Sequence, residues 1–582
     1  MTKLKAGLVL LVTLMAVNAT AQNPTFQLNN NKMNYLLRAV NDMYVDTVNF
    51  EKLVEKGVVE ILTELDPHSI YIPKKEVQQT NEPLQGAFDG IGVTFQLIKD
   101  TINVLEVIVG GPSEKVGLRP GDKIVKVDSS IACGKSINNK WVQTHLRGKK
   151  GTKVKVWVKR GQSKNLLEFT ITRDKIPMNS INVYFMVDKN TGYIRLERFA
   201  ATSPKEFSDA LAALKKQGMK HLIFDLRGNS GGYLDVAFKI ADEFIKKDRV
   251  IVYTDNRRHD GQKFYSTDKG DFEKGNLVVL VDEGSASASE IVSGAIQDWD
   301  RGLIIGRRTF GKGLVQKPMY LPDRSMIRLT ISRYYTPTGR CIQKPYDDND
   351  SYSQELNNRY KHGEYLTADS ISFPDSLKFT TPRGKVVYGG GGIMPDIFIP
   401  IDTTKYSTLY SELLRKGIFG EFAMQYLETH RNAMKVQYPD VEAFKDNFDV
   451  SDSLYAALMT YARKEGVKDT VTFNFSKRLE LFAKKENKKL DSLYKSMEDV
   501  KDTEALNTML TDFLKKSLNE SERLRNVEHS PQYIKDYLKY ELARYLYSWS
   551  DAARILLQQD DAFKHACDVI KDDKVFKKFK VD

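Results

Sequence analysis

Three serines stand close together in residues 282–291, which read DEGSASASEI. The stretch follows the apolar run 277–281, which is typical of a buried strand, and precedes residues with helical spacing. Small neighbours let a substrate approach closely, and a helix N-terminus favours developing negative charge. A single serine at such a place usually caps the helix. Three serines and two alanines exceed what capping requires, so the stretch predicts a nucleophilic site.

A serine nucleophile needs a base, and residues 309–316, TFGKGLVQ, offer Lys312 between glycines and apolar residues. A lysine acts as a base near neutral pH only if its pKa falls from about 10.4 by roughly three units, a shift of ~4 kcal/mol. Burial can supply this shift, whereas exposure to solvent cannot. A solvated loop lysine is the plain alternative, and the upstream serines favour the catalytic one.

The pentapeptide GNSGG at residues 228–232 is similar to the surroundings of the nucleophilic serine in trypsin-like proteases, which would make Ser230 the nucleophile. That class needs an upstream His and Asp on two β-barrels. Here an apolar strand enters and a helix leaves, and the upstream His68, His145 and His221 stand in unsuitable contexts. A phosphate loop is also disfavoured, because neither the Walker nor the G-x-G-x-x-G pattern fits. We expect the glycines to present backbone N–H groups and Ser230 to be a bystander.

Apolar periodicity predicts the elements that position these residues. Buried strands alternate with amphipathic helices between residues 182 and 400, which is typical of a sheet covered by helices. Two helices between residues 30 and 64 come before this block and end at the turn DPHS, where we expect His68 to stabilise the turn. The expected core strands are 193–196, 221–226, 277–281, 304–305 and 327–334, and the expected core helices are 204–216, 234–246 and 288–299.

Beyond residue 402 the sequence predicts a helical region. An aromatic stripe runs through its last predicted helix, and we expect it to pack in a core rather than to bind a ligand. The expected helices are 412–427, 452–464, 478–497, 503–524 and 531–557, and the stripe consists of Tyr533, Tyr537, Tyr540, Tyr545, Tyr547 and Trp549.

Residues 83–175 read as a β-rich module, and GLRPGDKIVKV at residues 117–127 resembles a PDZ domain. PDZ domains bind extended C-terminal peptides by strand addition and hold the terminal carboxylate on backbone N–H groups of a Gly-rich loop. The alternative is a structural β-module without a ligand. The resemblance places that loop at residues 89–93, with the peptide-binding residues Gly90, Ile91, Gly92 and Val93.

The chain of 582 residues is 41% hydrophobic and 28% charged, which fits three to four globular domains. Its formal charge is +12, but Lys residues are scattered among Asp and Glu, so we expect no nucleic-acid partner. Cys133, Cys341 and Cys567 are far apart, and we expect unpaired, mostly buried thiols, no metal site and no cofactor.

The N-terminus has the pattern of a secretory signal peptide. Lys3 and Lys5 precede an apolar run at residues 6–17, and an A-x-A site ends at Ala21. The run is too short for a membrane anchor, and no later segment is apolar enough to span a bilayer. We therefore expect export, to a periplasm, without a membrane span after signal removal.

Taken in order, the PDZ-like module and the strings DLRGNSGG, SASASEI and TFGKGLVQ resemble the C-terminal processing (tail-specific) protease family from about residue 30 to residue 400. The turn DPHSIY and the segment GGIMPD match the same pattern. The family uses a Ser/Lys dyad, and its spacing of 25 residues between nucleophile and lysine selects Ser287 over Ser285 and Ser289. The resemblance also implies that Gln316 orients the Lys312 amine.

The resemblance further implies an oxyanion site made by the N–H of Ala288 and one from Gly231 or Gly232, between which spacing does not decide. Thr309, Glu290 and Asp298 match other polar positions of the pattern and are expected to support the site.

The expected fold class is an α+β multidomain protein, with a PDZ-like β module, a ClpP/crotonase-like α/β protease core, N-terminal helices and a C-terminal helical region. The expected function is an exported serine endopeptidase that recognises accessible C-termini of protein substrates; an adaptor protein is compatible with it. The alternative is a catalytically inactive PDZ peptide-binding scaffold of the cell envelope, which the intact Ser287, Lys312 and Gln316 disfavour. The expected domains are 1–21 (signal peptide), 22–82 (N-terminal helices), 83–175 (PDZ), 176–402 (protease core) and 403–582 (helical region).

Overall fold

The structure is a computed structural model, and it describes residues 24–161, 163, 165–346, 349–402, 407–467 and 530–581. The chain forms two compact units. The first unit contains Met1–Val77 and Gln316–Thr330, and the second contains Gln78–Val315 and Ile331–Asp582. The predicted signal peptide and the helices predicted at residues 478–497 and 503–524 lie outside the described residues.

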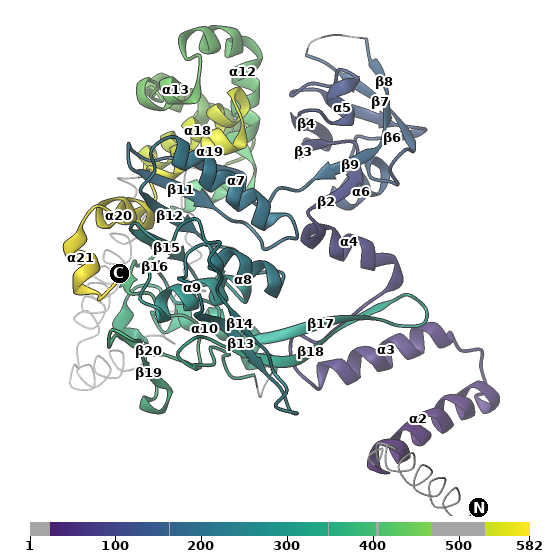
Figure 1. Cartoon of the computed structure of the whole chain (residues 1–582). Coiled ribbons are helices and arrows are strands. Elements are labelled where there is room, and N and C mark those ends of the chain that lie inside the picture. The colour runs from purple at the N-terminus through teal and green to yellow at the C-terminus, as the bar shows by residue number, and fades with distance from the viewer. Residues whose placement is uncertain are drawn as a thin grey trace, which may run out of the picture. The chain divides into compact units, whose positions relative to one another are not determined.

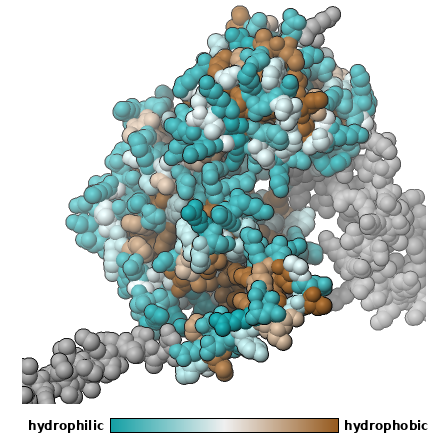
Figure 2. Space-filling view, turned by 90° about the vertical axis from the view of Figure 1, so that its right-hand side faces the viewer, coloured by the Kyte–Doolittle hydropathy of each residue, from teal (hydrophilic) through white to brown (hydrophobic). Residues whose placement is uncertain are grey.

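The first unit contains the two predicted helices, α2 (Pro24–Met43) and α3 (Phe50–Thr63). The Asn49 side chain caps α3 by accepting a hydrogen bond from Lys52 N. The short strand β1 (Ile70–Ile72) pairs antiparallel with the first residues of β18 (Met326–Tyr335). Both helices leave large apolar side chains exposed to solvent. Figure 2 shows one face of the molecule, on which apolar side chains, coloured brown, gather in patches.

A β module with the predicted PDZ character opens the second unit. Its sheet has the order β3-β4-β5-β7-β8, and β3 is an edge strand. Gly117 has a φ of +88° just after the helix α5, a backbone conformation that favours glycine. The elements of the module are β2 (Ala87–Gly90), β3 (Val93–Ile98), β4 (Thr101–Val107), α5 (Pro112–Lys115), β5 (Lys123–Val127), β6 (Ser130–Ile131), α6 (Asn139–Leu146), β7 (Lys153–Lys159), β8 (Leu167–Thr172) and β9 (Asp174–Pro177).

A six-stranded sheet with the order β10-β11-β12-β15-β16-β21 forms the centre of the second unit. The edge strand β10 is antiparallel, and each following pair is parallel. The continuous apolar run of β15 is buried at every residue, as expected for a parallel strand covered on both faces. The strands are β10 (Val183–Met186), β11 (Thr191–Arg195), β12 (His221–Asp225), β15 (Leu277–Val281), β16 (Leu303–Gly306) and β21 (Ile397–Phe398).

Helices cover both faces of this sheet (Figure 1). One face packs against α7 (Ser203–Lys216), α8 (Leu234–Asp242) and α9 (Ala288–Asp298). The other face packs against the last helices of the C-terminal region. Successive strand residues point to opposite faces, so Phe224 joins the first core and Ile223 the second. Full burial of an aliphatic or aromatic side chain contributes about 1.5–3 kcal/mol, so both layers stabilise the sheet.

Peripheral elements complete the second unit. The end of β18 pairs with β13, which pairs with β14. The remaining elements before the helical region are α4 (Lys74–Gln85), which starts in the first unit, β17 (Leu314–Tyr320), which passes from the second unit into the first, and β13 (Val250–Asp255), β14 (Lys263–Tyr265), α10 (Asn349–Lys361), β19 (Lys378–Thr380) and β20 (Val386–Tyr388).

The C-terminal region is helical where it is described, as predicted. Two of the predicted helices are broken. The helix predicted at residues 412–427 is interrupted at Gly417, where φ is +69°. The helix predicted at residues 531–557 is interrupted after Leu546, and a new helix begins after Ser548, whose side chain caps it. The tyrosines of the aromatic stripe pack in one hydrophobic cluster, with Tyr540 and Tyr545 buried there, whereas Trp549 packs against the core of the central sheet. The helices in this cluster are α11 (Thr408–Arg415), α12 (Ile418–Gln437), α13 (Val441–Asn447), α14 (Asp452–Lys464) and α18 (Ser530–Leu546).

Candidate active site

Three loops meet at the carboxyl ends of the neighbouring parallel strands β12, β15 and β16. In sheets of this kind ligands bind at this edge, because loops from adjacent strands converge there. The loop after β12 carries the GNSGG sequence, the loop after β15 carries the three serines, and the loop after β16 carries Lys312. The topology therefore gathers the stretches singled out in the sequence.

Of the three serines in the turn between β15 and α9, only Ser287 is accessible to solvent. Ser285 is fully buried, and its hydroxyl donates to Leu226 O at 2.9 Å. Ser289 is also fully buried, and its hydroxyl donates to Asn229 O at 2.7 Å. The two outer serines therefore fasten the turn to the loop after β12, and the middle serine is the one that solvent can reach.

Ser287 has an unusual backbone conformation, with φ +55° and ψ −110°. Residues other than glycine seldom adopt a positive φ, and such strain persists only where surrounding contacts enforce it. Strained strand-to-helix turns expose a nucleophilic hydroxyl in other hydrolases. The conformation therefore supports a functional role for this serine.

The Glu290 carboxylate enforces the conformation of two loops at once. Its Oε2 accepts from Ser287 N at 2.8 Å and from Lys312 N at 2.9 Å. Its Oε1 accepts from the Thr309 hydroxyl at 2.6 Å and from Gly311 N at 2.7 Å. Complete burial raises the pKa of Glu290, and these four hydrogen bonds oppose that effect. One buried side chain thus holds the Ser287 turn against the Lys312 loop.

Tyr334 makes a second link between the same loops. Its hydroxyl lies 2.6 Å from Lys312 O and 3.0 Å from Ser287 O, and its side chain is buried. Burial raises the pKa of Tyr334 well above its ordinary value, so the phenol stays protonated and can donate. The sequence does not single out this residue, because nothing in a strand pattern distinguishes a tyrosine that bonds two loops from one that only packs.

The loop at residues 228–232 lies directly against Ser287. A Cβ atom on Gly231 would come within 2.9 Å of Ser287 Cβ, 2.9 Å of Ala286 O and 3.0 Å of Ala288 N. Gly231 also has a φ of +103°. A residue with a side chain would therefore clash there and be strained, which accounts for glycine at this position.

Gly232 differs from Gly231 in what its N–H does. Gly231 N donates to Asn229 Oδ1 at 2.9 Å, so that group is already engaged. Among the hydrogen bonds given for the described residues, none uses Gly232 N, and Ala288 N is the first N–H of α9, which has no partner inside the helix. Gly232 and Ala288 are thus the better placed donors for an oxyanion.

Asn229 is the hub of this loop. Its Nδ2 donates to Leu196 O at 2.9 Å, and its carbonyl oxygen accepts from Ala286 N at 3.0 Å and from the Ser289 hydroxyl at 2.7 Å. The sequence does not single out Asn229. The residue is fully buried, and its N–H also donates to Leu226 O at 3.2 Å, so with the Gly231 N–H bond five hydrogen bonds of Asn229 fix the loop.

Ser230, the next residue, is exposed, in contrast to the buried Asn229. His221 stands at the opposite end of β12, where its Nδ1 accepts from Asn276 N at 3.1 Å. His145 stacks on Trp141 in the β module, with ring centroids 3.8 Å apart. A trypsin-like arrangement around Ser230 therefore finds no histidine partner among these two.

Gln316 belongs to the first unit, four residues after Lys312 in the sequence. Its Nε2 donates to His68 O at 2.5 Å, in the turn that follows α3. Asp66 organises this turn by accepting from His68 N at 2.8 Å and from Ser69 N at 2.9 Å, and Thr330 Oγ1 donates to it at 3.0 Å. His68 thus takes part in the turn through its backbone groups.

The expected carboxylate loop of the β module has the required glycine conformation. Gly92 has a φ of +76°, just before the edge strand β3. Ile91 is buried, and its carbonyl accepts from Ser113 N at 3.1 Å and from the Ser113 hydroxyl at 2.6 Å. Gly90 ends β2 and Val93 begins β3, so the predicted loop residues follow one another around this turn.

Two expectations need correction. Asp298 lies at the far end of α9 from Ser287 and does not join the network there; its carboxylate accepts from Arg340 at 2.6 Å and from the Thr338 hydroxyl at 2.7 Å. Cys133 is exposed and not buried, because it follows the short strand β6 at the surface of the β module, whereas Cys341 and Cys567 are half-buried.

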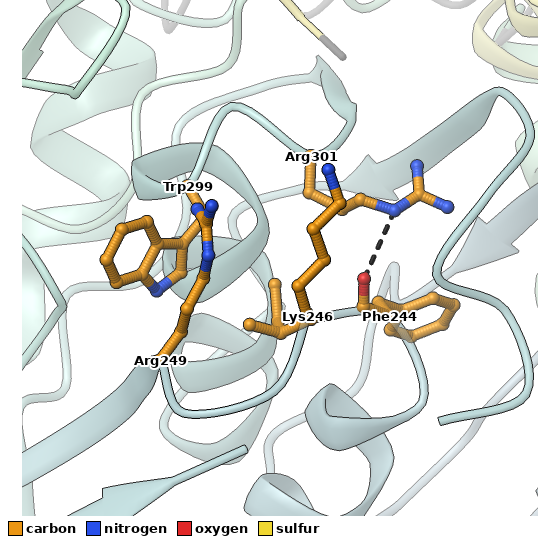
Figure 3. Close-up of a pocket in the computed structure, with 6 residues that line it drawn as sticks. Phe244, Lys246, Arg249, Trp299 and Arg301 are labelled. Carbon is orange, nitrogen blue, oxygen red and sulfur yellow. Dashed lines mark hydrogen bonds between the residues drawn. The ribbon is translucent and has the colours of Figure 1, made fainter. Parts of the chain in front are cut away.

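A small hollow lies near the C-terminal end of α9, opposite the end that carries Ser287 (Figure 3). Arg249 lies over the Trp299 ring, 4.5 Å from its centroid. Arg301 donates to the Phe244, Gly275 and Phe272 carbonyl oxygens at 2.8–3.1 Å, so its guanidinium is used in packing. The hollow contains none of the predicted site residues, and we assign it no function.

No group of three or more His, Cys, Asp or Glu residues in the described part of the chain is arranged to hold a metal ion. None of the helices described here has the length and apolar character needed to cross a membrane.

The fold and site define a PDZ-containing serine peptidase. The family model described as Peptidase family S41 matches residues 190–350, and a PDZ domain model matches residues 90–171. A family of unknown function matches residues 409–481.

Curated relatives agree with these matches. The carboxy-terminal processing protease CtpB of Bacillus subtilis is 32% identical over 346 residues, covering 58% of this chain and 69% of the relative. A probable CtpA-like serine protease of Staphylococcus aureus is 34% identical over 322 residues, covering 55% of this chain and 64% of the relative. Among solved structures, a photosystem II D1 C-terminal processing protease is 25% identical, with a TM-score of 0.33, covering 63% of this chain and 86% of that one. This chain belongs to the C-terminal processing (tail-specific) protease family of S41 serine peptidases.

Proposed function

We propose that this chain is an exported endopeptidase that cleaves proteins after recognising their C-terminal tails, with Ser287 as nucleophile and Lys312 as general base. The observation that carries the proposal is the accessibility of Ser287 in a strained turn whose backbone shares the Glu290 carboxylate with Lys312. The inactive-scaffold alternative is disfavoured, since the relatives above are named as proteases.

The proposed reaction is acyl transfer. Neutral Lys312 takes the hydroxyl proton of Ser287 while Ser287 Oγ bonds to the peptide carbonyl carbon. Collapse of the tetrahedral intermediate breaks the C–N bond, and the Lys312 ammonium returns its proton to the leaving amine. Water then attacks the acyl-enzyme with Lys312 again accepting a proton, which releases the new C-terminus and regenerates Ser287. The family pattern implies that Gln316 orients the lysine amine, and this role rests on the sequence pattern.

Developing negative charge on the carbonyl oxygen would be held by the N–H groups of Gly232 and Ala288. Gly231 instead serves by lacking a side chain, because its N–H is already donated to Asn229. Fixed donors of this kind need no reorganisation during the reaction, and the bonds around Asn229 and Glu290 support such preorganisation.

The β module would capture the substrate tail along the edge strand β3, with the terminal carboxylate on N–H groups at Gly90, Ile91, Gly92 and Val93. The domain boundaries at residues 82, 175 and 402 remain part of the proposal, as does export through a signal peptide ending at Ala21. The proposed partners are protein substrates with accessible C-termini, and an adaptor that delivers them fits the same scheme.

The test compares Ser287→Ala with Ser230→Ala on a substrate protein that carries a flexible apolar C-terminal tail. Ser287→Ala is expected to lower kcat by at least about 10³-fold. Ser230→Ala is the matched control, because it removes an exposed hydroxyl from the neighbouring loop and should retain activity close to wild type. Cleavage that survives in Ser287→Ala contradicts the dyad, and loss in Ser230→Ala alone would return the nucleophile to Ser230.

A further inference from the structure

The C-terminal segment from α19 onward forms the second layer of the protease core. Helices α19 (Trp549–Leu557), α20 (Asp561–Val569) and α21 (Asp573–Lys578) follow one another at the end of the chain. They bury apolar side chains against the sheet face opposite α7, α8 and α9 (Figure 1). This segment lies outside residues 190–350, to which the S41 family model is matched. One face of the sheet that carries the site is therefore covered by residues from a distant part of the chain.

One side chain of this segment reaches the site loops. Asp560 is the N-cap of α20, and its Oδ1 accepts from Phe563 N at 2.7 Å. The same carboxylate accepts from Arg227 Nη1 through both oxygens, at 2.8 and 2.7 Å. Arg227 directly precedes the loop at residues 228–232, so this ion pair ties the C-terminal segment to the base of that loop.

The other edge of the Arg227 guanidinium is occupied by Asp225. Arg227 Nη2 donates to Asp225 Oδ2 at 2.6 Å, and Nε donates to Oδ1 at 3.0 Å. The Tyr193 hydroxyl donates to the same carboxylate at 2.7 Å. Burial disfavours an ionised Asp225, but the charge and hydrogen bonds of Arg227, together with the charge of Arg195, outweigh burial and lower the pKa of this carboxyl. The guanidinium is thus held between two carboxylates, one at the end of β12 and one on α20.

This clamp fixes Arg227, the residue directly before a loop whose later residues touch the Ser287 turn. The next residue, Gly228, donates its N–H to Asp282 Oδ1 at 2.8 Å, and Gly284 N donates to the same oxygen at 3.0 Å. Arg227 is 15% exposed and Asp225 is fully buried, whereas Asp560 is 32% exposed, so the outer half of the clamp is the part that solvent can loosen. With Asp560 in place, both edges of a rigid, planar guanidinium are engaged.

We propose that Asp560 is a positioning residue of the peptidase, and that through Arg227 it holds residues 228–232 where their backbone faces the Ser287 turn. The C-terminal segment then completes the oxyanion site from outside the matched peptidase region. This inference rests on the proposed function, in which Gly232 and Ala288 hold the oxyanion.

The test uses full-length protein and three single variants. Asp560→Asn keeps a good helix cap while removing the charge that pairs with Arg227. Asp560→Glu restores the charge. Asp572→Asn is the matched control, because Asp572 is exposed and caps α21 by accepting from Lys574 N at 2.9 Å, and within the described part of the chain it makes no hydrogen bond or ion pair with the site loops.

Asp560→Asn is expected to lower kcat roughly tenfold with KM unchanged, because a loosened oxyanion loop weakens interactions made in the transition state. Asp560→Glu should recover most of that kcat, and Asp572→Asn should match wild type. A double variant adds a second readout: once Arg227→Lys has removed the planar fork, Asp560→Asn should cause little further loss. Thermal unfolding of each variant is measured alongside, since a purely structural role would shift Tm without the kcat-specific pattern.

Three results would overturn the inference: wild-type kcat in Asp560→Asn, an equal loss in Asp572→Asn, or independent losses in the double variant. Ser287→Ala, assayed in parallel, separates this failure from failure of the proposed function. If Ser287→Ala is inactive while Asp560→Asn is fully active, only the positioning role is lost. If Ser287→Ala still cleaves the substrate, the proposed dyad itself is wrong.

Discussion

A single methyl group at Gly231 tests whether the loop at residues 228–232 must touch the nucleophile. In Gly231→Ala the new Cβ would lie 2.9 Å from Ser287 Cβ, 2.9 Å from Ala286 O and 3.0 Å from Ala288 N. Two of these neighbours are backbone atoms, and the serine turn is fastened by Glu290, so the crowding has no flexible side chain to displace. The loop or the turn has to move.

The size of the effect follows from two terms. Overpacking of a tight interior site costs about 1–3 kcal/mol. A residue with a side chain at the φ of +103° adds about 1–3 kcal/mol of backbone strain. A shift of the loop by a few tenths of an ångström relieves part of the overpacking and strain. The same shift moves Gly232 N and Ala288 N away from the position of the oxyanion that they are proposed to bind. Loss of one oxyanion donor lowers kcat about 10²–10³-fold, so we expect a fall of about 10²-fold.

The assay is steady-state cleavage of the tailed substrate, with chemical denaturation of the same preparations. Gly218→Ala is the control: Gly218 has a φ of +95°, but a Cβ there would meet only Lys189 O at 3.6 Å, an ordinary contact. It therefore carries the backbone strain without the crowding, and should lose stability while keeping kcat. Wild-type kcat in Gly231→Ala, or an equal kcat loss in Gly218→Ala, would refute the reasoning.

Further predictions concern the charges and the β module. Glu290→Gln replaces one accepting oxygen by an NH₂ group that faces two N–H donors, so we expect the free energy of unfolding to fall by about 3–6 kcal/mol in denaturation experiments. An unchanged stability would contradict the four bonds assigned to this carboxylate. Asp225→Asn leaves the Arg227 charge with one partner fewer, and should destabilise the protein by about 3–5 kcal/mol at neutral pH. Because the folded pKa of Asp225 is depressed, the wild-type advantage is complete above the ordinary value of 3.8 and is lost as pH falls through the folded pKa, so the Tm gap between the two proteins should close in acid. Amidation of the substrate C-terminus should raise KM several-fold without changing kcat, since it removes the carboxylate that the loop at Gly90 to Val93 is proposed to hold; unchanged KM would make the β module a structural or regulatory element only.

Local patterns predicted those parts of the fold that local physics determines. The run Leu277–Val281 was assigned to a buried strand because covered parallel strands are apolar at every residue, and β15 has these bounds. The helix predicted at residues 412–427 was wrong at Gly417, because a periodic apolar pattern continues across a glycine that the backbone uses to change direction. Likewise, the expectation that Cys133 is buried rests on the high average burial of cysteine. The residue is exposed, because its position depends on the path of one surface strand.

The residues of the site likewise fall into those that the sequence could predict and those that depend on distant contacts. Ser287 could be selected over Ser285 and Ser289 by spacing, and the burial of the two outer serines gives a physical reason for that choice. Tyr334 could not be found from the sequence, because its role depends on which carbonyl oxygens surround its hydroxyl. Asp560 is 333 residues from Arg227 in the chain, and no sequence pattern around either residue predicts that the two form an ion pair. Such contacts follow from the packing of the last helices on the sheet, which the sequence predicted only as a helical region.

The GNSGG stretch shows why a short motif underdetermines the atom that does the chemistry. In a trypsin-like barrel the serine of this pentapeptide would be the nucleophile, as its sequence suggested. Here the stretch connects a parallel strand to a helix, and the neighbouring parallel strand ends in a second serine-rich turn at the same sheet edge. Asn229 faces inward and binds that turn, which leaves Ser230 outward and brings Gly231 against Ser287. In the proposed function the pentapeptide contributes backbone and the next loop contributes the hydroxyl, and the strand order supports this division, because two adjacent parallel strands deliver two loops to one point.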